Sequence, residues 1–125
     1  MTNLELFSKE ETTKILVGLG MPINLKGFKY MQDCVVHVIK EPNDIKLVTK
    51  KLYPQIGLEH SVNASVVERS MRHATDIAYI KTGFKNLSKL YDVEEDTFNY
   101  KPSNSELIAI ISEALRFKAL KAGLL

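Results

Sequence analysis

The clearest pattern of hydrophobic and polar positions lies between residues 62 and 81. At the ~100° per residue of an α-helix, this stretch separates into an apolar side and a polar side. We therefore expect a long, partly exposed helix from near Ala64 to near Ile80, docked on a core through one side. The apolar side comprises Val66, Val67, Ser70, Met71, Ala74, Ile77 and Ala78.

The opposite side of this helix concentrates hydrogen-bonding groups. Guanidiniums, carboxylates, an imidazole and a hydroxyl follow one another within a few turns, and such groups read base edges in a DNA major groove. A charged outer side is more often only a solvated helix, so periodicity alone leaves both interpretations open. The polar line runs through Ser65, Arg69, Arg72 and Asp76, flanked by Glu68, His73 and Tyr79.

A shorter amphipathic piece from Leu52 to His60 precedes the long helix. Pro54 suits the first turn of a helix, where its missing N–H costs nothing. Asn63 follows a short polar turn and is a good N-cap for the second helix, which Gly83 ends. Two helices joined by a tight turn, over about residues 52–81, form the outline of a helix-turn-helix.

The remaining segments also have helical periodicity, and none alternates as a strand does. A capping box at Ser8 predicts the start of a first helix that ends at Gly20, and another at Ser103 predicts the start of the last helix. Further helices are expected over residues 25–39, after Pro42 and over 86–91, with an exposed loop over 92–101. The chain is predicted to be all-α, with about six helices.

Composition fits one globular domain over residues 1–125, with 45% hydrophobic residues and a net charge of +2. The lone Cys34 suits a reducing compartment, and no apolar run reaches the ~20 residues that span a bilayer, so we expect a cytoplasmic protein. The small net charge hides a basic middle section made by Lys46, Lys50, Lys51, Arg69, Arg72, Lys81 and Lys85.

Three separated motifs give the sequence a resemblance to a known protein family. In this order and at this spacing they closely resemble the C-terminal effector domain of the sporulation master response regulator of endospore-forming bacteria, over about residues 15–117. They are Leu52-Tyr53-Pro54, then Ala64-Ser65-x-Val67-Glu68-Arg69-x-x-Arg72-His73-Ala74, and then Lys101-Pro102-x-Asn104-Ser105-Glu106-x-Ile108-Ala109.

The resemblance implies a six-helix effector domain that places a recognition helix in the major groove of boxes related to TGTCGAA. By match, base and phosphate contacts fall to Glu68, Arg69, Arg72 and His73. The resemblance also implies a surface toward the RNA polymerase sigma factor at about residues 82–95. It further implies self-association on tandem DNA sites, for which the loop 92–100 and the last helix are the expected contact surfaces, with a monomer expected in the absence of DNA.

Arg69 is the strongest single candidate, because a guanidinium bonds O6 and N7 of guanine together. Glu68 suits a cytosine amine, and it also suits an ion pair with Arg72 one turn along the helix. His73 suits a phosphate or plain solvent exposure. The hydroxyl of Ser65 suits a phosphate at the start of the helix. Asp76 lies on the same polar line, and Lys50 and Lys51 are expected to contact phosphates.

Other chemistry finds little support in the sequence. Cys34 and His37 have a C-x-x-H spacing, but no second pair of ligands follows, so we expect a core cysteine beside an exposed histidine and no metal. No nucleophile–base constellation or nucleotide-binding motif occurs, so we expect neither an enzyme nor a cofactor.

The regulators that the chain resembles begin with a receiver domain, which these helices do not contain. A fragment of a longer regulator and a stand-alone effector domain are both open, and the N-terminal sequence favours the second. The alternative to a DNA reader is an interaction module or competitor that titrates the full-length regulator or the sigma factor.

Overall fold

A computed structural model describes all residues from 1 to 125 as helices and connecting turns, with no strand. The predicted all-α class is confirmed. The α-helices are α1 (Asn3–Gly18), α2 (Lys26–Lys40), α3 (Tyr53–Glu59), α4 (Ala64–Thr82) and α5 (Asn104–Lys121). The shorter helical segments are η1 (Pro42–Leu47), η2 (Val48–Leu52), η3 (Lys85–Leu90) and η4 (Glu95–Phe98).

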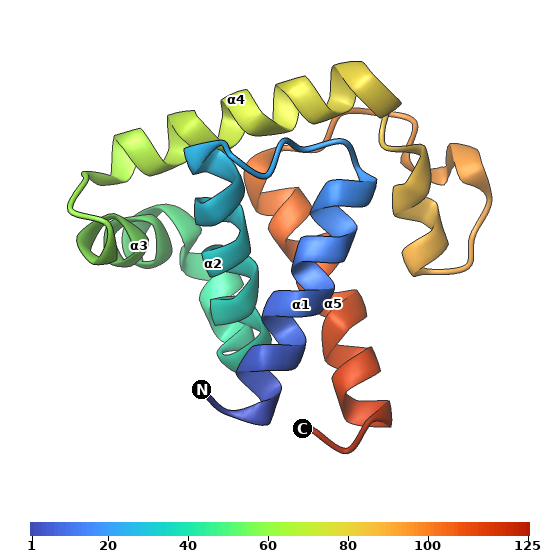
Figure 1. Ribbon diagram of the computed structural model, residues 1–125, viewed down its shortest axis with the longest axis horizontal. Coiled ribbons are helices and arrows are strands. Elements are labelled where there is room, and N and C mark those ends of the chain that lie inside the picture. The colour runs from blue at the N-terminus through green and yellow to red at the C-terminus, as the bar shows by residue number, and fades with distance from the viewer.

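Helices α1, α2 and α5 pack against one another, and α4 lies across one end of this group, where its main contacts are with α2 (Figure 1). Both chain ends lie at the opposite end of the group. Leu16 of α1, Met31 of α2 and Ile111 of α5 are completely buried in one continuous core. Since each such side chain contributes ~1.5–3 kcal/mol on burial, this core supports α4 as a rigid element.

The predicted start of the first helix at Ser8 is wrong. The helix begins at Asn3, and Thr2 caps it by accepting a hydrogen bond from the backbone N–H of Glu5 at 3.1 Å. Ser8 lies inside the helix and is fully buried. The earlier start is favoured because it brings Leu4 onto the core, and residues 2–5 repeat the hydroxyl-to-carboxylate spacing of residues 8–11.

His37 is not the exposed side chain expected from the sequence. Its Nε2 lies 2.7 Å from Oδ2 of Asp44, and the ammonium of Lys51 lies 3.1 Å from the other oxygen of the same carboxylate. The hydrogen bond to His37 and then that to Lys51 hold the pKa of Asp44 below its ordinary value. This cluster ties the carboxyl end of α2 to η1 and η2, the segment predicted only as a third helix after Pro42.

The limits of α4 agree with the prediction. The side chain of Asn63 accepts from the N–H of Val66 at 3.1 Å, and Gly83 ends the helix at a φ of 62°. The inward side is narrower than predicted, because Val66 and Ile77 are only half-buried. Tyr79, predicted beside the polar side, is half-buried too and packs its ring against that of Phe84.

Two contacts fix α4 against its neighbours. Gly27 of α2 packs directly on the backbone of Ser70, where a Cβ would lie 2.1 Å from the carbonyl oxygen. Asn104, the first residue of α5, donates to the backbone carbonyl of Glu68 at 3.0 Å and accepts from the buried hydroxyl of Thr75 at 3.4 Å. Helix α4 is therefore held from two directions while its outer side stays open to solvent.

None of these helices combines the length and the apolar character that crossing a membrane requires.

Candidate nucleic-acid interface

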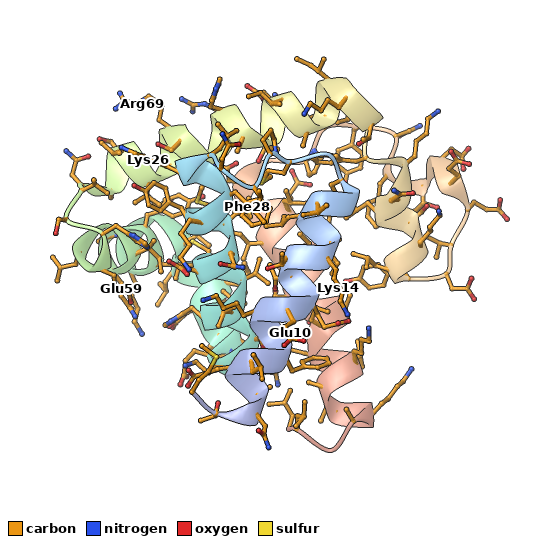
Figure 2. The ribbon with its side chains drawn as sticks, in the orientation of Figure 1. Glu10, Lys14, Lys26, Phe28, Glu59 and Arg69 are labelled. Carbon is orange, nitrogen blue, oxygen red and sulfur yellow. The ribbon has the colours of Figure 1, made fainter.

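The outer side of α4 carries most of the hydrogen-bonding side chains that the sequence predicts as DNA contacts. Arg69, Arg72 and His73 are all exposed. Figure 2 shows Arg69 above α4, projecting away from the helical body. An α-helix with its side chains is ~10–12 Å across, which fits the ~12 Å width of the major groove. Helix α4 therefore matches the groove in size as well as in chemistry.

Arg69 and Arg72 differ in their partners. The guanidinium of Arg69 makes no hydrogen bond or ion pair within the protein, so all its donors are available to a ligand. Arg72 donates from Nη1 to the carboxylate of Glu68 at 2.7 Å, one helical turn away. Both members of that pair are solvent-accessible, so the pair contributes only a few tenths of a kcal/mol to stability. Its main effect is to restrict where the guanidinium of Arg72 can point.

Ser65 and Asp76 of α4 already have partners within the protein. The hydroxyl of Ser65 donates to the side-chain oxygen of Asn63 at 2.6 Å, in the cap of the helix. Asp76 forms an ion pair with Lys101 from the segment before α5. The charges of Glu68 and Asp76 are therefore balanced by neighbouring cations, while the guanidinium of Arg69 and the imidazole of His73 face solvent without a partner carboxylate.

Helix α3 meets α4 through a tight turn. The N–H of Val62 donates to the carbonyl of Gly57 at 2.9 Å, and Ser61 adopts a φ of 59° to reverse the chain. A Cβ on Gly57 would lie 2.5 Å from the carbonyl oxygen of Val62, so only glycine allows this approach. The result is a pair of packed helices whose second member presents its polar side outward.

Two cations beside α4 escaped the sequence reasoning. Lys26, in the first turn of α2, lines a shallow hollow together with Arg69 and His73. Lys101 lines a second hollow, on the other flank, with Glu68 and Arg72. Neither was predicted, because each reaches α4 only through packing between helices that are distant in the sequence.

The two predicted phosphate-binding lysines fall in different surroundings. Lys50 is exposed and lines a hollow with Ser105 from the first turn of α5, which itself abuts α4. Lys51 is held by Asp44 and points to the last turn of α2. That turn lies ~15 Å along the helix axis from Gly27, the contact of α2 with α4. Lys50 and Lys51 are therefore adjacent in the sequence, but only Lys50 lies close to α4.

A family model for the C-terminal domain of the sporulation initiation factor Spo0A matches residues 12–115. The chain belongs to this family. The match extends from α1 to α5 and includes the whole of α3 and α4. Membership in the Spo0A C-terminal family makes the chain a DNA-binding domain of transcription regulation in sporulation, and the family is not one of enzymes.

Proposed function

We propose that this protein is a sequence-specific regulator that reads double-stranded boxes related to TGTCGAA through the outer side of α4. The observation that carries the proposal is Arg69, an exposed guanidinium without any partner in the protein, on the outer side of α4. An unpaired guanidinium loses no internal bond when it binds, so the full value of a contact to guanine is available.

The roles proposed for the α4 side chains follow from their positions. Arg69 bonds O6 and N7 of one guanine, which favours that base by ~1–3 kcal/mol. Arg72 lies three residues on and ~4.5 Å along the axis, about the 3.4 Å rise of a base pair, so it reaches a neighbouring base pair. Glu68 keeps the guanidinium of Arg72 oriented or accepts from a cytosine amine. His73 and Ser65 contact phosphates.

Phosphate contacts on both flanks of α4 would fix its register on the duplex. Lys26 and Lys101 flank the exposed polar face of α4, one on each side. Lys50 extends the positive region past the first turn of α5. We assign smaller contributions to Lys51 and Lys101, because their ammoniums are bound by Asp44 and Asp76. Asp76 is assigned an indirect role, since it positions Lys101 beside the groove.

Two protein contacts complete the proposal, and both rest on the family resemblance. The segment from residue 82 to residue 95 would face the RNA polymerase sigma factor. Copies bound to tandem boxes would touch through the loop at 92–100 and α5. Residues 91–97 of this region are all exposed and include the acidic run 94–96, whereas Phe84 and Leu87 are buried in the core.

A gel-shift titration tests the proposal. One duplex contains TGTCGAA and the other contains the same bases scrambled. We expect the first duplex to bind at least ~10³-fold more tightly than the second at physiological salt. Equal affinity for both duplexes would show that the protein does not distinguish base sequences. Binding to neither, together with capture of the sigma factor or of a full-length regulator, would instead favour the interaction module.

A further inference from the structure

We propose that Asp33, Glu59 and His60 form a binding site for a divalent transition-metal ion of the Zn²⁺ or Co²⁺ type. One ligand atom from each residue lies within 4.8 Å of the other two. Asp33 comes from the middle of α2, whereas Glu59 and His60 come from the end of α3. The inference is independent of DNA reading, because the site lies away from the outer side of α4, and Figure 2 shows Glu59 beyond α3 on the other side from Arg69.

The arrangement of donor atoms is close to that of a bound ion. A tetrahedral ion with bonds of ~2.0–2.1 Å separates its ligand atoms by roughly 3.3 Å. Nε2 of His60 lies 2.6 Å from Oδ2 of Asp33, so this pair opens by less than ~1 Å to admit the ion. The carboxylate of Glu59 is exposed and within 4.8 Å of the other two ligand atoms, so it would approach by at most ~1.5 Å to reach the tetrahedral spacing.

The imidazole is already oriented toward the carboxylates. The ring of His60 packs edge-on against that of Tyr30, with centroids 5.0 Å apart and an angle of 67° between the planes. Tyr30 is buried and therefore fixed. The side chains of Asp33 and His60 are 22% and 26% exposed, so an ion reaches them from solvent and sheds only part of its hydration.

A second histidine–aspartate pair in the same chain shows what distinguishes this cluster. His37 and Asp44 lie 2.7 Å apart, but the third group there is the ammonium of Lys51, which repels a cation. At His60 the third group is a carboxylate. Lys29 does lie 3.6 Å from the other oxygen of Asp33, yet two carboxylates against one ammonium still leave the site negative.

The donor set identifies the class of metal. One imidazole nitrogen and two carboxylate oxygens suit Zn²⁺, Co²⁺ or Ni²⁺ better than Ca²⁺ or Mg²⁺, which prefer oxygen ligands alone. Three protein ligands leave an outer position for water. The ion would join α2 to the last turn of α3, a connection that spacing in the sequence does not reveal because Asp33 and His60 are 27 residues apart.

Titration with Co²⁺ tests the site, because bound Co²⁺ acquires visible absorption that follows occupancy directly. The tag-free chain of 125 residues would be used at neutral pH, with saturation expected at one equivalent of Co²⁺. Glu59→Gln and His60→Gln should each weaken binding at least ~10-fold, since even the loss of a group behind a ligand costs that much. The matched control His37→Gln, which alters the other pair, should bind as the wild type does.

Three results would overturn the proposal. The first is the absence of saturable binding below millimolar Co²⁺, which makes the cluster an ordinary ion pair. The second is unchanged affinity in Glu59→Gln, a variant of an exposed residue that leaves the fold intact. The third is a loss in His37→Gln as large as that in His60→Gln, which moves binding to the other pair.

Discussion

Substitution of Gly27 by alanine tests how α2 supports the recognition helix. Gly27 is in the first turn of α2 and contacts α4 at Ser70, the residue after Arg69. A Cβ there would lie 2.1 Å from the carbonyl oxygen of Ser70 and 2.8 Å from the Cβ of Ala74. An ordinary contact begins at 3.4 Å, so the two helices must move apart by more than ~1 Å. Neither atom belongs to a flexible side chain that could yield.

The cost follows from that displacement. Overpacking of a close-packed region destabilises by ~1–3 kcal/mol, and a backbone neighbour places this case at or above the upper end. The better helix propensity of alanine returns at most ~1 kcal/mol. We expect the free energy of unfolding to fall by about 2–3 kcal/mol. We expect DNA affinity to fall as well, because α4 loses its support directly behind Arg69.

Urea denaturation followed by circular dichroism measures the effect. The matched control is Gly18→Ala at the end of α1, where a Cβ would meet nothing within 4 Å. That variant should be as stable as the wild type or up to ~1 kcal/mol more stable. If Gly27→Ala also unfolds within ~0.5 kcal/mol of the wild type, the spread typical of neutral substitutions, then α2 and α4 do not pack as described.

Three further outcomes are expected. Lys50→Ala should weaken binding to the specific and the scrambled duplex alike. Titrations across a salt series should show the slope of log K against log salt concentration lowered by about one, and an unchanged slope would show that Lys50 contacts no phosphate. Asp44 has a lowered pKa, so its contribution to stability is present above about pH 4, the ordinary carboxyl value, and is lost as the pH falls through the lowered pKa. Acid unfolding curves of Asp44→Asn should therefore be flatter in that range than those of the wild type, and parallel curves would refute the linkage. Met71→Asp should lower the melting temperature severely, because it buries an unpaired charge at a fully buried position, and an unchanged melt would mean that this side of α4 is not buried.

The sequence carried enough information to predict α4 and its orientation. Its cap, its end and its buried stripe are local features, determined by Asn63, by Gly83 and by apolar residues at helical spacing. The exposed side chains of the predicted interface follow from that periodicity. The start of α5 follows from the local capping box at Ser103, which is confirmed. Their roles on DNA remain proposals.

Contacts between distant segments were beyond sequence reasoning. Thr75 is polar yet buried, and its hydrogen-bond partner Asn104 lies 29 residues away in the sequence. Asp76 was expected to be free for a ligand, but Lys101 neutralises it. The surroundings of His37 likewise depend on the path of η1, which no periodicity indicates.

The central claim is that the outer side of α4 distinguishes base sequences, and Arg69→Ala tests it most directly. Affinities of the wild type and the variant would be measured on the TGTCGAA duplex and on its scrambled form. Loss of a guanine contact should cost ~1–3 kcal/mol, or roughly 5- to 150-fold, on the specific duplex and much less on the scrambled one. An equal loss on both duplexes would make Arg69 a phosphate anchor, and no loss on either would contradict the assignment of α4 as the reading surface.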